Sequence, residues 1–110
     1  KIGLNLSRGK PVKYYSSDRI AQYMGNGLLT LIHENVQYQD FFKKDEIVTY
    51  KNFDDLVEKI KFFINNDNLR KKIANKGRRK YLREFSSEKI SKYIVTKSMN
   101  INIKDKFLWE

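Results

Sequence analysis

Hydrophobic and polar residues alternate at the start of the chain, and later apolar residues recur at helical spacing. In residues 1–7 (KIGLNLS) three aliphatic side chains alternate with small or polar ones, a pattern that predicts a β-strand. Residues 28–32 (LLTLI) and 45–50 (DEIVTY) are short apolar or β-branched runs of strand length. The pattern therefore predicts three strands.

The segment between the first two predicted strands is expected to hold a loop and a short helix. Ser16 or Ser17 is expected to cap the helix, because a side-chain oxygen can accept a hydrogen bond from a free backbone N–H group there. Asp18 falls in the expected first turn, where the helix dipole favours negative charge. Gly25 or Gly27 is expected to end the helix in a left-handed conformation. A loop, a helix start and a strand edge in this order suit an anionic ligand.

Three further helices are expected in the second half of the chain. The most amphipathic follows Asn52, its expected cap, and its apolar stripe comprises Phe53, Leu56, Val57, Ile60, Phe63 and Ile64. Asp67 is the expected cap of the next helix, whose apolar side comprises Leu69, Ile73, Ala74, Gly77, Tyr81 and Phe85. The last helix is expected from Ser86 to about Met99, with Phe85 and Ile90 at the spacing of a hydrophobic staple.

Strands that alternate with helices indicate a parallel sheet with right-handed crossovers. We therefore expect an α/β fold: a Rossmann-like three-layer domain fragment with a short parallel sheet and C-terminal helices, spanning residues 1–99. Residues 100–110 form a tail whose apolar patch (Phe107, Leu108, Trp109) must pack or bind. The chain opens at Lys1 rather than methionine, so we expect it to be the C-terminal part of a larger protein.

Composition excludes several classes of site. The absence of cysteine excludes disulfides and thiolate metal sites, and a single histidine argues against a histidine-rich metal centre. No apolar run approaches the roughly 18 residues of a membrane span, and no signal peptide is visible. We expect a cytoplasmic protein. Peripheral association with a membrane is a second possibility.

The formal charge of +10 suits a polyanion, and residues 70–83 hold eight basic side chains and no acidic one. This run has three interpretations: a nucleic-acid patch, a contact for an anionic membrane surface, or the solvated outer face of a packed helix. A basic nucleic-acid-binding module stays an alternative. Because no recognised nucleic-acid motif accompanies the charge, we do not expect nucleic acid to be the partner.

Several pieces of the chain, in this order, resemble the donor-binding C-terminal domain of glycosyltransferases with the two-domain GT-B architecture, often called group 1. They are the opening strand KIGLNLS, the helix residues Arg19-Ile20-Ala21-Gln22, the turn Gly25-Asn26-Gly27, the strand LLTLI, the unit IVTYKNFDDLVEKIKFFINN, and closing helices with the mid-helix Gly77. The resemblance covers residues 1–99.

The resemblance implies that a nucleoside-diphosphate sugar binds at the carboxyl ends of the strands, in agreement with the rule for open α/β sheets. The sugar would move to an unknown acceptor without a metal or other cofactor. The acceptor domain and catalytic base would lie outside these residues, so no catalytic residue is assigned. The glutamate that holds the donor ribose in the family corresponds to Gln22, and a second family glutamate corresponds to Tyr14. A degenerate copy of the fold that acts as an interaction domain is therefore a further alternative.

The residues expected to bind the donor lie in the loop, at the helix start and just after the second strand. Arg19 is the expected clamp on the diphosphate, although a solvated arginine is the other interpretation. The serines can act as caps or as phosphate ligands, and a loop tyrosine can stack on a base or simply pack. The full expected set is Lys13, Tyr14, Ser16, Ser17, Arg19, Gln22, His33 and Glu34.

Overall fold

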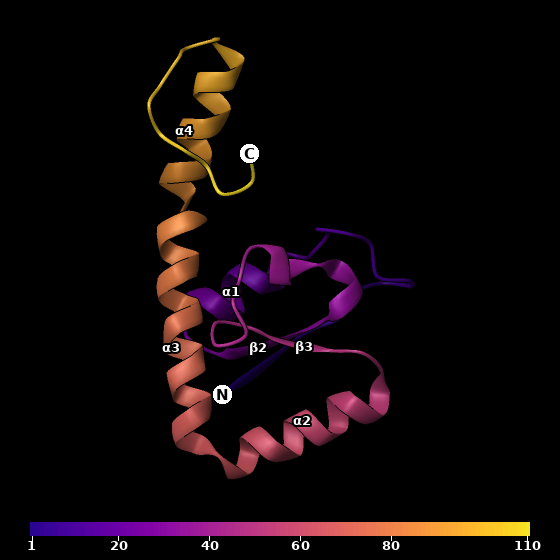
Figure 1. Ribbon diagram of the computed structural model, residues 1–110. Helices are drawn as coiled ribbons and strands as arrows, with labels where there is room; N and C mark the ends of the chain where they lie inside the picture. Colours follow the sequence, from indigo (N-terminus) through magenta and orange to yellow (C-terminus); the bar gives the residue numbers. More distant parts are fainter.

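The computed structural model describes all 110 residues and confirms the α/β class (Figure 1). Three parallel strands and four α-helices follow one another along the chain, and two single 3₁₀ turns, Glu34–Val36 and Tyr38–Asp40, join the second and third strands. The elements are β1 (Ile2–Asn5), α1 (Arg19–Gly25), β2 (Leu29–His33), β3 (Val48–Tyr50), α2 (Phe53–Asn65), α3 (Asp67–Glu84) and α4 (Ser87–Ser98).

The sheet has the order β1-β2-β3, with Leu31 of β2 paired to Leu4 on one side and Val48 on the other. Successive side chains point to opposite faces, so each face has its own core. Leu29, Leu31 and Val48 pack with α2 and α3 on one face, whereas Ile32 packs with α1 and the segment before β3 on the other. This three-layer arrangement is the expected Rossmann-like fragment.

Helix α3 lies along the amino ends of the strands (Figure 1). Arg70 Nη1 donates to the Lys1 carbonyl at 3.2 Å, just before β1, and Arg78 Nε donates to the Gly25 carbonyl at 2.9 Å, shortly before β2. Gly77 packs against the Glu46 carbonyl, two residues before β3. Because α3 covers the amino edge of the sheet, the carboxyl edge on the opposite side is the one left for a ligand.

The expected serine cap of α1 is wrong. The helix begins at Arg19, and Asp18 occupies the cap position in a helical conformation without a side-chain cap. The Ser17 carbonyl accepts from the Ile20 N–H group at 3.1 Å, while its hydroxyl is engaged by tertiary contacts. At the other end Gly27, with φ of +71°, takes the left-handed conformation.

The caps of α2 and α4 are confirmed, because Asn52 and Ser86 each accept a hydrogen bond from the backbone N–H three residues on. Asp67 is not a cap: it is the first residue of α3, and its carboxylate pairs with Arg70 and Lys71. Because these two side chains, three and four residues further on, engage the Asp67 carboxylate, it does not cap the helix.

Two elements are less extensive in the structure than their sequence patterns predict. The third strand is shorter than expected, because the N–H groups of Glu46 and Ile47 both turn back to the Lys43 carbonyl. On α2, Leu56 and Phe63 are buried, but the outer members of the expected stripe, Phe53 and Ile64, are 75% and 64% exposed. Helix α2 thus contacts the sheet along a narrower strip than its sequence pattern indicates.

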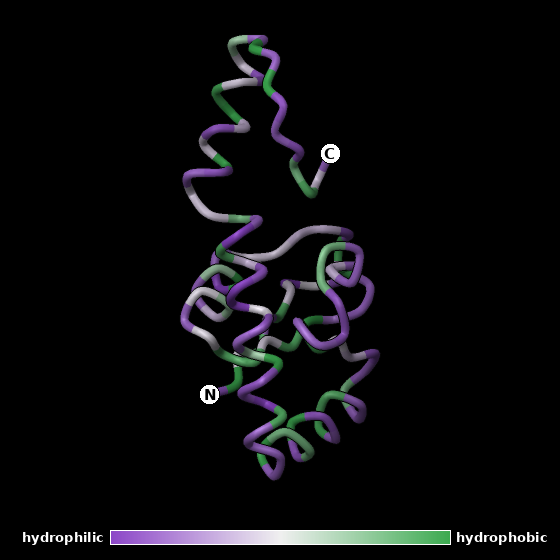
Figure 2. The backbone as a smooth tube through the Cα atoms, turned by 60° about the vertical axis from the view of Figure 1, so that its left-hand side comes forward, coloured by the Kyte–Doolittle hydropathy of each residue, from purple (hydrophilic) through white to green (hydrophobic).

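The C-terminal tail packs along α4, and the two run side by side in Figures 1 and 2. Phe107 is buried, and Trp109 stacks on Phe85 with ring centroids 5.5 Å apart. Trp109 also meets the Tyr93 ring edge-on at 5.5 Å. These rings connect the tail to the end of α3, so the apolar patch does pack, as the sequence required. None of the helices is both long and apolar enough to cross a membrane.

Substitution of Gly77 by alanine is expected to destabilise the fold. A Cβ atom at this position would overlap the Glu46 backbone carbonyl and lie 3.0 Å from the Met24 methyl group. The overlap with backbone is expected to cost about 1 to 3 kcal/mol, more than the gain in helix propensity of up to about 1 kcal/mol. Urea unfolding measures the difference. The control is Gly25→Ala, where nothing lies within 4 Å and stability should be unchanged or slightly higher; equal effects of the two variants would contradict the prediction.

Asp67 is expected to make stability depend on pH in the acid range. Hydrogen bonds from Lys71 and then Arg70 lower the pKa of its carboxyl group from 3.8 to about 2. A lowered native pKa stabilises the fold above the unfolded-state pKa, near 4, and that contribution is lost as the pH falls toward 2. The urea midpoint of Asp67→Asn should therefore fall less than that of the wild type across this range. Glu58→Gln, at an exposed position of α2, should keep the wild-type slope.

Candidate functional site

The carboxyl ends of the three strands meet at one edge of the sheet, formed by Asn5, His33 and Tyr50. The loop 6–18, the first 3₁₀ turn and the start of α2 continue from these ends. Open α/β sheets bind ligands at this edge. No group of three or more His, Cys, Asp or Glu side chains is placed to hold a metal ion.

A chain of hydrogen bonds joins the end of β1 to the start of α1. Arg19 Nη2 donates to the Leu6 carbonyl and Arg19 Nε to Ser17 Oγ, both at 2.9 Å. Ser17 Oγ donates in turn to Asn5 Oδ1 at 3.4 Å. The structure therefore brings two of the expected residues, Ser17 and Arg19, together at the tip of β1.

These contacts orient the Arg19 guanidinium but leave some of its N–H groups free. Two of its five N–H groups are used, the residue is exposed, and it forms no ion pair with Asp18 or any other acid. Gln22 lies one turn further along α1, is also exposed, and its side-chain amide makes no hydrogen bond within the chain. Donors and acceptors on this side of α1 are therefore free for a ligand.

Asn5 was not among the expected site residues, because its place in an alternating strand pattern carries no functional signal. It is 2% exposed, and its Nδ2 atom has no hydrogen-bond partner. Buried polar groups nearly always find a partner, so an unpaired amide nitrogen is unusual. Its only side-chain partner, Ser17, links it to Arg19.

The remaining loop residues hold the loop against the protein. Tyr14, in a left-handed conformation with φ of 60°, donates from its hydroxyl to Asp40 Oδ2 at 2.7 Å and packs its ring on Phe41. The Lys13 ammonium lies 4.7 Å from the centre of the Tyr14 ring. Ser16 Oγ shares a 2.7 Å hydrogen bond with the Tyr38 hydroxyl. Tyr14 and Ser16 thus fix the loop conformation.

His33 ends β2 rather than following it, and it belongs to the opposite face from Asn5. Its ring meets Tyr50 edge-on, with centroids 5.3 Å apart, and its Nδ1 accepts from the Asn35 N–H at 3.1 Å. Glu34 opens the next 3₁₀ turn, half-buried, and its carboxylate has no ion pair. The structure therefore does not bring His33 into the cluster with Ser17 and Arg19.

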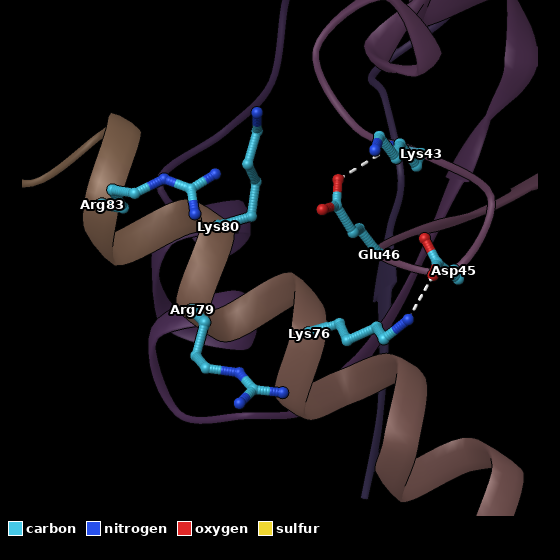
Figure 3. Close-up of a pocket in the computed structure, with 7 residues that line it drawn as sticks. All are labelled: Lys43, Asp45, Glu46, Lys76, Arg79, Lys80 and Arg83. Atoms are coloured by element: carbon cyan, nitrogen blue, oxygen red, sulfur yellow. Dashed lines mark hydrogen bonds and ion pairs between the residues drawn. The ribbon is translucent and has the colours of Figure 1, made fainter.

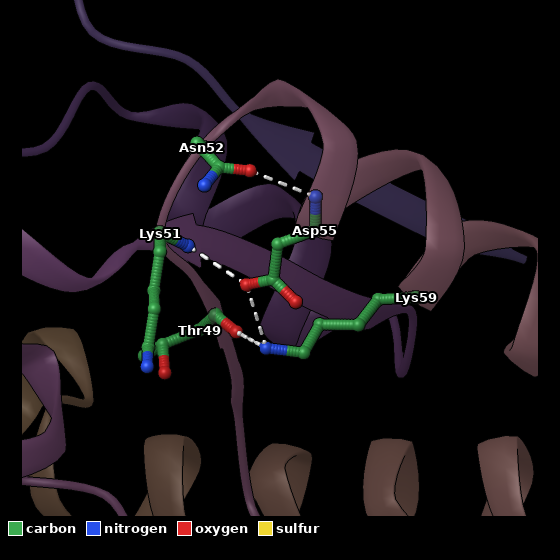
Figure 4. Close-up of polar contacts among 5 residues, drawn as sticks. All are labelled: Thr49, Lys51, Asn52, Asp55 and Lys59. Carbon is green, nitrogen blue, oxygen red and sulfur yellow. Dashed lines mark hydrogen bonds and ion pairs between the residues drawn. The ribbon is translucent and has the colours of Figure 1, made fainter.

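The end of β3 carries a polar network that the sequence analysis missed (Figure 4). The Asp55 carboxylate accepts from the Lys51 N–H at 2.9 Å and from Lys59 Nζ at 3.0 Å. Lys59 Nζ also donates to the Thr49 carbonyl at 2.6 Å. The Lys51 backbone hydrogen bond, followed by Lys59, lowers the pKa of the Asp55 carboxyl group. This network fixes the start of α2 at the carboxyl edge.

The spacing of Asn52 and Asp55 was the signal available for this network. An N-cap residue and an acid three residues later form a capping box, in which each side chain accepts from backbone near the other. Asn52 Oδ1 accepts from the Asp55 N–H, as in that motif, but Asp55 reaches back one residue further, to Lys51. The cap was therefore predictable from the sequence, and so was an acid three residues later as its partner, but not the exact backbone group that this acid binds.

Comparison with known proteins gives one match. A protein-family model described as glycosyl transferase-like matches residues 1–96, which include all three strands and most of α4. No curated protein and no solved structure matches the chain.

Removal of the Asn52 side chain is expected to destabilise the start of α2. Asn52→Ala leaves the Asp55 N–H without its cap, and loss of such a cap costs about 1 kcal/mol. Urea unfolding should show that loss. Asn68→Ala is the matched control, because this exposed asparagine in the first turn of α3 makes no hydrogen bond through its side chain. A control variant that loses as much stability as Asn52→Ala would refute the role of the cap.

Proposed function

The chain belongs to the glycosyl transferase-like family, and from this premise we propose that it forms the donor-binding part of a GT-B glycosyltransferase. The proposed reaction transfers a sugar from a nucleoside diphosphate to an acceptor bound by another domain. The observation that carries the proposal beyond family membership is the placement of Arg19. Its guanidinium lies at the tip of β1, on the sheet edge where ligands of α/β proteins bind.

Arg19 supplies the charge that a diphosphate requires. A guanidinium presents N–H groups in a plane and can hold two phosphate oxygens at once. In sugar transfer the nucleoside diphosphate leaves with additional negative charge, and a fixed cation beside it lowers the energy of that step. The contacts to Ser17 and the Leu6 carbonyl hold the cation in position before the donor arrives.

Neighbouring side chains complete the proposed site. The free Gln22 amide can hydrogen-bond the ribose diol, without the charge of a carboxylate. We expect Glu34, whose carboxylate next to β2 has no ion pair, to accept hydrogen bonds from donor hydroxyl groups. Lys13, Tyr14 and Ser16 contribute through the loop that they hold, and His33 approaches from the other face of the sheet.

A second candidate is a non-catalytic copy of the fold that serves as an interaction domain. The observation that favours it is the pair of replacements Tyr14 and Gln22, where the resemblance places glutamates. The Tyr14 hydroxyl is already engaged by Asp40, so it does not substitute for a ligand-binding carboxylate. This candidate retains the fold but predicts no donor binding.

Titration of the chain with UDP-, GDP- and ADP-sugars, followed by backbone amide NMR shifts, separates the two candidates. We expect weak binding of one of these donors, with shifts concentrated around Arg19 and Gln22. Loss of charge-assisted hydrogen bonds in Arg19→Ala should weaken binding by about tenfold to a hundredfold.

Arg79→Ala is the matched control, because it removes the same charge from the opposite edge of the sheet and should bind like the wild type. If none of the donors shifts amides near α1, the donor-binding proposal is wrong. Equal weakening by both substitutions would show that overall charge, and not the Arg19 site, attracts the nucleotide.

A further inference from the structure

The outer side of α3 carries an uninterrupted row of basic residues, which we call the basic stripe. It consists of Lys72, Lys76, Arg79, Lys80 and Arg83, at spacing i, i+4, i+7, i+8 and i+11. This spacing places the five side chains on one face of the helix. The buried residues of α3, among them Ile73 and Ala74, border the stripe, and Lys76 and Lys80 at that border are half-buried, whereas Lys72, Arg79 and Arg83 are exposed.

The chain neutralises only part of this charge. Lys76 pairs with Asp45 at 2.5 Å, and Arg83 pairs with Glu84 at 2.8 Å. Lys72, Arg79 and Lys80 have no ion pair. An open hollow of about 380 Å³ beside the stripe is lined by five basic and two acidic side chains and no apolar one (Figure 3).

The stripe costs the helix stability, and only Lys76, through its ion pair with Asp45, ties it to another part of the chain. Basic side chains three or four residues apart repel one another, as Lys76 and Lys80 or Arg79 and Arg83 do here. The buried core contacts of α3 come from Ile73 and Ala74, which do not belong to the stripe. Because Lys72, Arg79 and Lys80 have no counterpart within the chain, this row of like charges indicates an anionic partner outside it.

We propose that the basic stripe binds the surface of a membrane that contains anionic lipids. In Figure 3 the side chains of Arg79 and Lys80 extend in different directions, so they cover an extended area and do not converge on one small anion. Juxtamembrane basic residues bind anionic lipid surfaces through additive, non-directional attraction. An extended charged face of this kind matches that mode of binding.

Two exposed leucines favour a lipid surface over a nucleic acid. Leu69 precedes the stripe by three residues and is 42% exposed, and Leu82 lies between its last two members and is 47% exposed. Leucine side chains can enter the interfacial layer of a bilayer, whereas a phosphate backbone offers them no apolar contact. The one aromatic ring within the span of the stripe, that of Tyr81, packs against the core and stacks on Phe85, so it is not presented for base stacking.

Binding through α3 is compatible with the rest of the molecule. Helix α3 covers the amino edge of the sheet, so a bilayer on its outer side leaves the carboxyl edge open. The inference does not depend on donor binding, and either proposal can fail without the other.

Co-sedimentation of the chain with phosphatidylcholine vesicles, with or without phosphatidylglycerol, tests the proposal. We expect binding only to vesicles that contain phosphatidylglycerol, and weaker binding at higher salt. The triple variant Arg79→Gln, Lys80→Gln, Arg83→Gln should lose roughly a hundredfold in affinity. Leu69→Ser with Leu82→Ser should give a smaller loss.

A second triple variant, Lys10→Gln, Lys61→Gln, Lys104→Gln, lowers the net charge equally at exposed positions outside the stripe and should bind nearly like the wild type. Circular dichroism confirms that each variant is folded. Three outcomes would overturn the proposal: no binding to phosphatidylglycerol vesicles, equal losses in the two triple variants, or tighter stripe-dependent binding to an RNA or DNA duplex than to vesicles.

Discussion

The close approach of α3 to the amino ends of the strands determines how the rest of the chain is arranged. At Gly77 the helix meets the Glu46 backbone with no room for a side chain. The buried Arg70 side chain pairs with Asp67 and donates to the Lys1 carbonyl, which compensates a cation that is otherwise costly to bury. With this edge covered by a helix, the carboxyl edge is the part of the sheet where a ligand can approach the strand ends.

The two edges present positive charge in different ways. At the carboxyl edge one guanidinium, that of Arg19, is held by a carbonyl and a hydroxyl group and has free N–H groups remaining. At the amino edge Lys72, Arg79 and Lys80 have no fixed partner. A cation held by fixed contacts favours an anion of defined shape, whereas a row of cations without fixed partners favours an extended surface. Positive charge is thus presented in one way at the carboxyl edge and in another at the amino edge.

Local features of the sequence predicted much of the fold. The strands, the Asn52 and Ser86 caps and the order of the elements depend on residues within a few positions of one another, and the structure confirms them. The failures lie where another side chain, near or distant in the sequence, competes for the same group. Ser17 does not cap α1 because its hydroxyl bonds to Asn5 and Arg19, and Asp67 does not cap α3 because Arg70 and Lys71 engage its carboxylate.

The same limit applies to the candidate site. Sequence position placed Arg19 and His33 near the strand ends, but it could not reveal that alternation along β2 turns His33 toward Tyr50, on the face opposite Asn5. Nor could it reveal the Leu6 carbonyl that orients Arg19, because a backbone group has no sequence signature. A guanidinium fixed in this way loses little conformational freedom when a ligand binds, which raises the affinity gained from each new hydrogen bond. Gln22, one turn further along α1, adds no charge beside Arg19, and the guanidinium forms no ion pair within the chain, so two of its contacts are to neutral oxygen atoms and its other N–H groups stay free.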